Sequence, residues 1–301
     1  MRTMFWQRLL CKVTALPRPL LVGVAIVGSV VVVSVLGPLL YTVSATVPSA
    51  IPLAPPSVAH WFGADGVGRD VLAQLLVGGR AALVVAGLAG LGTVVVGAGI
   101  GIFAGLLGGV AEKLLMRLVD VVLAIPKLPL LILIAAFLDP GVIGVAVIIA
   151  LTSWAPVARI MRSQTLALRS SSKILAARGA GAGNFYLVRR HLVPDLGLLL
   201  VAGLVTAAGR AVVVQAGLAF LGVGSTTVPS WGLMLHQALD SPGLLFTHAW
   251  LWWLLPPVAA LAFLLVGFML IGAGVEAHLN PNLSRHHREQ RLLESVASEA
   301  A

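Results

Sequence analysis

Charged residues are scarce in this sequence. They make up 10% of its 301 residues, against a hydrophobic share of 59% and a mean hydropathy of +1.02, whereas a soluble domain carries roughly 25% charged residues. So few polar side chains could not cover the surface of a soluble chain of this length. This excludes an ordinary soluble protein and makes the lipid bilayer the solvent for much of the chain.

Cysteine is almost absent, and so are the signatures of several enzyme classes. The single cysteine, Cys11, excludes an internal disulfide and a multi-cysteine zinc site. The chain has no Gly-x-x-x-x-Gly-Lys-Ser/Thr loop to hold ATP phosphates, no Gly-x-Ser-x-Gly motif and no His/Glu pair at metal-ligand spacing. We therefore expect a protein that is not itself an enzyme, with no metal site and no cofactor of its own.

Long apolar runs are what the sequence has instead. The run from Pro19 to Tyr41 is uncharged and longer than the ~7–15 apolar residues of a signal peptide, which favours an uncleaved first span. The further runs are close to the ~20 residues that a transmembrane helix needs. The expected spans are 20–40, 81–110, 118–138, 142–157, 196–221 and 250–275.

Prolines and polar residues separate these spans. Four prolines between positions 48 and 56 block continuous helix, so residues 42–79 are expected outside the membrane. The expected organisation is an N-terminus with the first span at 1–41, an extracytoplasmic segment at 42–79, a core of five spans at 80–276 with a polar segment at 159–195, and a tail at 277–301. Gly99, Gly101 and Gly105 suit close packing between helices.

The cations predict the orientation of the chain. The net charge is +9, but the cations cluster between apolar runs, which indicates orientation in a membrane rather than binding to nucleic acid. Four Lys and Arg residues precede the first span, two separate spans two and three, seven separate spans four and five, and three lie in the tail. All fall on one side if the crossings alternate. The other side keeps only Arg69 and Arg80, so the positive-inside rule predicts that both termini are cytoplasmic.

The polar segment 159–195 is the most informative part of the chain. Its seven cations would cost about 2.5–3.5 kcal/mol each at mid-bilayer, so it must stand outside the membrane. The pattern predicts two helices separated by glycines 179, 181 and 183, with serines from Ser170 onward capping the first helix and Asn184 capping the second. Pro194 should end the second helix, whose expected apolar face comprises Phe185, Val188 and Leu192.

Several motifs, in collinear order, resemble those of one family. Ala176-Ala177-Arg178 with Gly181, followed by His191-Leu-Val-Pro194, resembles the EAA loop of ABC importer permeases. The stretch 62–72, FGADGVGRDVL, looks like the periplasmic element of the C-type permease subunit in dipeptide and oligopeptide importers. Three further stretches are similar to the family's segments across spans two and three and at the exit of span five, namely 105–109 (GLLGG), 116–126 (MRLVD to Ile-Pro) and 215–232 (QAGLAFLGVG to PSWG).

The resemblance covers about residues 20–280 and implies an all-α, MetI-like permease with six transmembrane helices and both termini cytoplasmic. It implies one half of a peptide pathway in a bacterial plasma membrane, beside a homologous second permease. Its other partners would be one or two cytoplasmic ABC ATPase subunits, which bind ATP and Mg, an extracytoplasmic solute-binding protein, and membrane lipid. The residues assigned to ATPase coupling are Ala176, Ala177, Arg178, Gly179, Ala180, Gly181, Ala182 and Gly183.

Two positions depart from the family pattern. Leu175 and Gln215 stand where the family has glutamates. The first departure removes a charge contact expected toward the ATPase, and the second removes a charge near the membrane exit. Docking of the loop would rest on its shape and is not affected.

A few polar residues inside the spans are candidates for the pathway. Arg210 in span five either lines the pathway, where it would attract a peptide carboxylate, or faces the bundle and snorkels. Gln215 is a second candidate. Lys127 lies seven residues after Asp120, and a structural pair or snorkelling is favoured over a contact with cargo.

Other cargoes and mechanisms stay open at this point. The same architecture could import nickel or another small solute, although the histidines lie where metal ligation is disfavoured. A secondary transporter or channel is the alternative from another class. Such proteins carry acidic residues inside their spans for ion coupling, and only Asp120 comes near to qualifying.

Overall fold

The computed structural model describes residues 18–138, 140–223 and 228–279. This part of the chain is helical, and its one bridge outside helices pairs Ala64 with Asp70. The all-α prediction is therefore confirmed for the described residues. The elements are α2 (Arg18–Leu40), α3 (Val71–Leu107), α4 (Gly109–Ala124), α5 (Lys127–Leu138), α6 (Val142–Ser153), α7 (Ala155–Arg169), α8 (Ser172–Gly179), α9 (Asn184–Leu187), the π-helix η1 (Val188–Leu192), α10 (Val193–Asp195), α11 (Gly197–Phe220), α12 (Trp231–Asp240), the 3-10 helix η2 (Leu244–Phe246), α13 (Trp250–Trp253) and α14 (Leu255–Leu279).

The described residues contain four to six candidate membrane spans. Helices α2, α3 and α11 and the stretch Trp250–Ala277 are each long and apolar enough to cross a bilayer. The pairs α4–α5 and α6–α7 also qualify if each bent pair counts as one span. The six predicted runs correspond to these four helices and two bent pairs. Residues 1–17 and most of the predicted tail lie outside the described residues.

The third and fourth predicted spans are bent helix pairs. The third bends by 78° between α4 and α5, because Ile125 precedes Pro126 and is extended (ψ 125°), the conformation favoured before proline. The fourth bends by 45° between α6 and α7, where Pro156 sits in the first turn of α7. Helix α7 then continues to Arg169, well beyond the predicted end of the span at residue 157.

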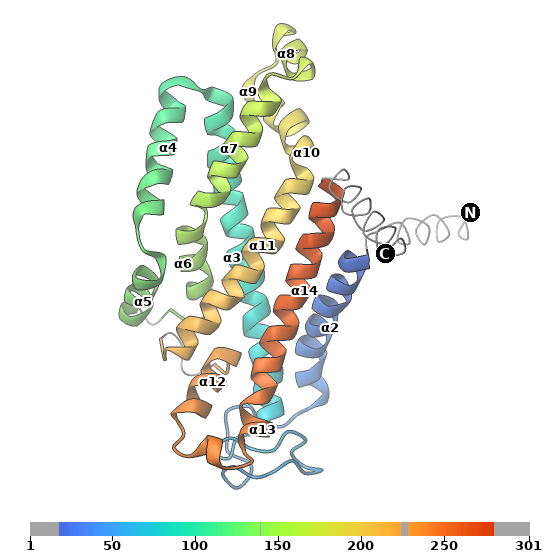
Figure 1. Cartoon of the computed structure of the whole chain (residues 1–301), viewed down its shortest axis with the longest axis vertical. Coiled ribbons are helices and arrows are strands. Elements are labelled where there is room, and N and C mark those ends of the chain that lie inside the picture. The colour runs from blue at the N-terminus through green and yellow to red at the C-terminus, as the bar shows by residue number, and fades with distance from the viewer. Residues whose placement is uncertain (1–17, 139, 224–227, 280–301) are drawn as a thin grey trace, which may run out of the picture.

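Helix α3 is the axis of the bundle. Its 37 residues correspond to about 55 Å, and it begins at Val71, inside the range predicted as extra-membrane. It packs against α2, α6, α7 and α11 (Figure 1). Figure 1 places α8 and α9 at one end of the molecule and α12, α13 and the segment 41–70 at the other. We call these the hairpin end and the loop end.

Glycines bring α7 directly onto the α3 backbone. A Cβ on Gly97 would lie 2.6 Å from the Trp154 oxygen, and one on Gly105 would lie 2.8 Å from the Thr165 Cβ. A Cβ on Gly101 would also overlap the backbone of α7. The predicted packing role of Gly101 and Gly105 is confirmed. Gly99 has no neighbour within 4 Å, so its predicted packing role is wrong.

A buried carboxylate, Asp65, organises the loop end. It accepts hydrogen bonds from the backbone nitrogens of Val67 and Arg69, from Arg69 Nε (2.8 Å) and from Gln74 Nε2 (2.9 Å). Arg69 also donates to Gln237 Oε1 on α12 (3.0 Å). Charge-assisted bonds of this kind are the strong ones. The motif at 62–72 therefore ties the loop to both α3 and α12.

Asp70 starts α3 and holds the end of α2. Its side chain accepts from Ala73 N (2.7 Å) as the N-cap of α3. It also accepts from the Tyr41 hydroxyl (2.7 Å) and lies 2.8 Å from His60 Nδ1. Burial and the hydrogen bond to Asp70 raise the pKa of Tyr41 above its usual range. The Tyr41 phenol therefore remains a neutral donor to this carboxylate.

Arg80 replaces a hydrogen bond that a proline removes from α2. Pro38 lies inside this helix and has no N–H to donate to the carbonyl of Ser34, four residues earlier. Arg80 Nε donates to that oxygen (2.8 Å), and Arg80 Nη2 donates to the Val35 oxygen (2.9 Å). The guanidinium thus satisfies a freed carbonyl and joins α2 to α3.

The pairing of Arg80 with Pro38 is testable by a double-mutant cycle. Arg80→Met leaves the Ser34 oxygen without its donor, which should cost about 1–3 kcal/mol. Pro38→Ala restores an N–H to the helix, so Arg80→Met should cost clearly less in that background. The thermal midpoint of the detergent-solubilised protein measures both effects. Equal losses in the two backgrounds would contradict the pairing.

Candidate coupling hairpin and pathway residues

The polar segment folds as a two-helix hairpin at one end of the bundle. Helix α8 leaves α7 through Ser170 and Ser171, and α9, η1 and α10 return to α11. Figure 1 shows this unit projecting beyond the ends of α4 and α7. The predicted helix–turn–helix is therefore confirmed. We call residues 170–195 the hairpin.

The hairpin turns through a glycine-dependent helix stop. Gly181 N donates to the Arg178 oxygen (2.9 Å), and Ala182 N donates to the Ala177 oxygen (3.0 Å). These two bonds, with Gly181 at φ +86°, form a Schellman motif. A residue with a side chain is strained at this φ, so the backbone itself requires glycine here.

Buried aliphatic side chains attach the hairpin to the bundle. Ile174, Leu187 and Leu192 are each 0% exposed. They form one cluster with Ile102 and Leu106 at the end of α3. Full burial of such side chains stabilises by about 1.5–3 kcal/mol each. The hairpin is therefore packed firmly against its base and moves with it.

Two cations complete this attachment. Arg178 Nη2 donates to the Leu106 oxygen (3.3 Å), one of the last carbonyls of α3, which have no partner within the helix. The positive charge also suits the negative end of the helix dipole. Lys173 Nζ pairs with the Asp195 carboxylate (2.7 Å) and closes the hairpin between the start of α8 and α10.

The opposite face of the hairpin is open and partly apolar. Leu175 is 55% exposed, Phe185 72% and Tyr186 53%. A Cβ added at Gly179, Gly181 or Gly183 would meet nothing within 4 Å. Large apolar side chains that are exposed outside the membrane spans are typical of a surface that contacts another protein. We call Leu175, Phe185 and Tyr186 the outer patch.

The eight predicted coupling residues divide between these two faces. Ala177, Arg178 and Ala182 are partly buried, and the two alanines pack against the cluster below the hairpin. The exposed members are Ala176, Gly179, Ala180, Gly181 and Gly183. Contact of these residues with an ATPase stays a prediction. The geometry adds an inward role for Arg178, which binds the end of α3.

Three details of the predicted hairpin are wrong. Ser171 is the N-cap of α8, but its side chain makes no capping bond. Gly183 rather than Asn184 occupies the N-cap of α9. Pro194 does not end the second helix, since it lies in the first turn of α10, which leads on to α11.

The predicted apolar face of the second helix is confirmed at two of its three positions. Leu192 is 0% exposed, and Val188 packs against the same buried cluster. Phe185 is 72% exposed, so its predicted place in that face is wrong. The buried Leu187 lies five residues before Leu192, and Val188–Leu192 form a π-helix, in which the i→i+5 bond replaces the i→i+4 bond. Spacing of three and four residues could not predict that Leu187 is buried.

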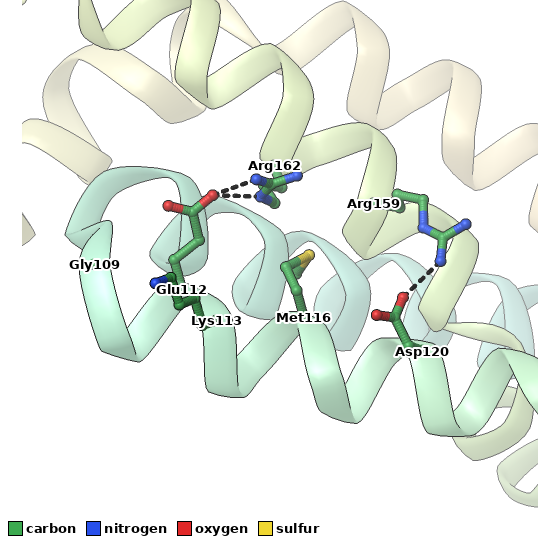
Figure 2. Close-up of a pocket in the computed structure, with 7 residues that line it drawn as sticks. All are labelled: Gly109, Glu112, Lys113, Met116, Asp120, Arg159 and Arg162. Carbon is green, nitrogen blue, oxygen red and sulfur yellow. Dashed lines mark hydrogen bonds and ion pairs between the residues drawn. The ribbon is translucent and has the colours of Figure 1, made fainter.

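An open groove of about 500 Å³ lies between α4 and α7. Figure 2 shows two ion pairs across it, Arg159 Nη2 with Asp120 Oδ1 (2.7 Å) and Arg162 with Glu112. The partner of Asp120 is therefore Arg159, so of the two roles expected for Lys127 a structural pair with Asp120 is not formed. The two bridges fasten α4 to α7, the helix that leads into the hairpin.

The structure does not bring the two pathway candidates together. Arg210 is exposed on α11. Gln215, on the same helix, is 8% exposed and lines a small cavity with residues of α6 and the segment before α12, including Val145 and Ser230. Five residues along a helix turn a side chain by roughly 140°, so the two face different spaces. Their roles in a pathway stay predictions.

Sequence comparisons identify relatives of this chain. Residues 97–285 match the family model described as "Binding-protein-dependent transport system inner membrane component". A chain of Brucella ovis described as a peptide permease protein is 37% identical over 227 residues, which is 75% of this chain and 74% of that one. The dipeptide transport system permease protein DppC of Bacillus subtilis is 32% identical over 77% of this chain and 71% of its own. The glutathione transport system permease protein GsiD of Pectobacterium atrosepticum is 32% identical over 76% and 74%.

The glycine stop of the hairpin is testable by hydrogen exchange. Gly181→Ala should cost roughly 1–2 kcal/mol, because alanine is forced to a positive φ. The Gly181 and Ala182 amides should then exchange about 5–30 times faster, as read by mass spectrometry. Gly179→Ala is the matched control, since Gly179 is helical and equally open. Equal acceleration of exchange in both variants would contradict a specific requirement for glycine at position 181.

Proposed function

Since the chain belongs to the family of binding-protein-dependent transport system inner membrane components, we propose that it forms one half of the translocation pathway of an ATP-driven importer. A homologous second permease supplies the other half. One or two cytoplasmic ABC ATPase subunits bind ATP and Mg and drive the cycle. An extracytoplasmic binding protein delivers the solute. This chain hydrolyses nothing itself.

The hairpin is the observation that carries the proposal. It offers an open outer patch to a partner while its underside is fixed to α3 and α7 by buried aliphatic residues and by Arg178. A partner that closes around the patch can therefore push on the ends of two spans. Such a rigid, outward-facing element is what mechanical coupling to an ATPase needs.

Helix α3 gives that push a route across the membrane. Its hairpin end receives Arg178, and its loop end begins at Asp70, which also holds α2 through Tyr41. Because glycines seat α7 against the α3 backbone, the two helices move together. A displacement of the hairpin thus tilts the elements that close the loop end, which gives alternating access to the solute.

The charges support a cytoplasmic hairpin. The cations Lys173, Arg178, Arg189 and Arg190 all lie within it, and the positive-inside rule places such a cluster in the cytoplasm. Helix α2 begins and α14 ends toward the hairpin end (Figure 1). This supports an orientation in a bacterial plasma membrane in which the start of α2 and the end of α14 face the cytoplasm.

The names of the relatives support a peptide as the cargo. The similar proteins are described as permeases for peptides, dipeptides, oligopeptides and glutathione. These descriptions favour peptide import over the nickel alternative. A secondary transporter lacks a use for a hairpin of this construction.

Cross-linking tests the hairpin contact. In a Cys11→Ser background, Ala180→Cys places a thiol on the open side of the turn without disturbing Gly181. A thiol-reactive bridging reagent should link it to the ATPase subunit in native membranes. Val58→Cys, 96% exposed at the loop end, should give no such link. Modification of Ala180→Cys from outside intact cells by an impermeant reagent would refute the orientation.

Truncation of the outer patch tests its energetic role. Phe185→Ala should reduce co-purification of the ATPase by about tenfold or more, as expected for removal of an interface aromatic worth over 1 kcal/mol. Phe246→Ala is the matched control, because Phe246 is 97% exposed at the loop end. It should leave co-purification intact. Full ATPase recovery with Phe185→Ala would argue against docking through this patch.

A further inference from the structure

One face of α11 is exposed along most of its length and is not uniformly apolar. Thr206, Arg210, Val213, Gly217 and Phe220 are exposed, and their spacing of three to four residues places them on one side of the helix. Arg210 lies near the middle of this 24-residue candidate span. This face therefore presents a cation at the depth of the bilayer.

The charge of Arg210 makes contact of this face with lipid unfavourable. A charged side chain at mid-bilayer is costly, so such residues face a water-filled cavity or a polar partner. Helix α2 provides the contrast, since Val31, Val32, Val33, Val35 and Leu36 are exposed on it, and its exposed Ser29 is neutral and donates its hydroxyl to the Ile26 oxygen of the same helix. The exposed side of α2 has the composition of a lipid contact, and the Arg210 side of α11 does not.

A second cation lies on a helix that shares a buried cluster with α11. Lys127 is the first residue of α5, directly after the break at Pro126. Leu131, one turn after Lys127, and Ala211, next to Arg210, belong to one buried cluster, so both cations are carried by helix segments that meet in this cluster. The five ion pairs among the described residues involve neither cation. A carboxylate from outside these helices would give both cations a partner.

We propose that Lys127 and Arg210 form a site in the translocation pathway that binds a carboxylate of the cargo. The planar guanidinium can hold a carboxylate with two parallel hydrogen bonds, and the ammonium adds a compact charge. The broken α4–α5 span and α11 each contribute one cation, so relative movement of the two spans makes or breaks the site. This inference rests on the proposed function, since it requires that the chain forms a solute pathway.

Thiol chemistry tests the site without knowledge of the cargo. In a Cys11→Ser background, Arg210→Cys is exposed to an anionic methanethiosulfonate (sulfonatoethyl) and to a cationic one (trimethylammonium-ethyl) in native membranes. The anionic reagent should react faster because Lys127 attracts it. Adding Lys127→Gln should lower the anionic-to-cationic rate ratio about tenfold, the scale expected for one nearby charge in a partly aqueous site.

Two control positions locate the water. Val213→Cys, one turn along the same face, should also react with both charged reagents. Val32→Cys, on the aliphatic side of α2, should react with neither. If Arg210→Cys resists both reagents, the face is sealed and the site does not exist. If it reacts without charge preference, the face is wet but binds no anion, which overturns this inference and leaves the importer assignment standing.

Uptake identifies the source of the carboxylate. Cells carrying the complete importer are given labelled dialanine with a free C-terminus or as its C-terminal amide, with succinate as a competitor. The free form should be taken up about tenfold better, since one charge-assisted pair is at stake. Arg210→Gln should remove that preference, and Arg210→Lys should restore part of it. An unchanged preference in Arg210→Gln overturns the site.

The remaining outcomes separate this inference from the proposed function. Competition by succinate at the wild-type site, abolished in Arg210→Gln, supports a general carboxylate site rather than one for peptide termini. Absence of dialanine uptake in the wild type counts against the peptide cargo. The thiol experiment then still decides whether the cationic site is present.

Discussion

Helix α3 can act as the axis of this molecule because both of its ends are held by charged side chains. A helix leaves four N–H groups and four carbonyls unpaired at its termini. At each end of α3 a charged side chain binds one of these groups. Asp70 caps the first turn, and Arg178 donates to the Leu106 carbonyl at the last. Arg169 Nη1 lies 3.5 Å from the Gly105 oxygen of the same turn. These caps connect the helix to the loop at one end and to the hairpin at the other, so the groups that complete the helix also attach its working parts.

Prolines interrupt the backbone hydrogen bonding of two other spans, α2 and the α4–α5 pair. A proline removes a backbone donor and bends the helix. In α2 the Ser34 oxygen, which Pro38 cannot bind, accepts a hydrogen bond from Arg80 of α3. This bond links the two spans. In the α4–α5 pair the break at Pro126 creates a new helix start and brings Lys127 to it. In these two spans, therefore, a proline explains why a cation lies where it does.

The sequence predicts where the apolar helices lie, but it does not predict their bends or the π-helix. Composition and length alone locate α2, α3, α11 and α14, because lipid tolerates only long apolar helices. The bends could be suspected at Pro126 and Pro156, but their angles depend on packing against neighbouring spans. The π-helix at Val188–Leu192 could not be seen, since a single extra residue in a turn leaves no signature in hydrophobic spacing. The buried Leu187, five residues before Leu192, was missed for this reason.

Polar partners were the other part that local patterns could not supply. The motif around Asp65 and Asp70 identifies a structured loop, but the bonds to Gln237 on α12 and to Tyr41 after α2 join positions far apart in the chain. Asp120 illustrates the same limit. A search along its own helix suggests Lys127, whereas the bend at Pro126 carries Lys127 toward α11 and leaves Asp120 to Arg159 on α7. Once the bend is known, the assignment follows from charge. A carboxylate on α4 pairs with the guanidinium across the groove. Lys127, beyond the bend, belongs to the helix whose Leu131 shares a buried cluster with Ala211 of α11, and this is the arrangement that the proposed carboxylate site requires.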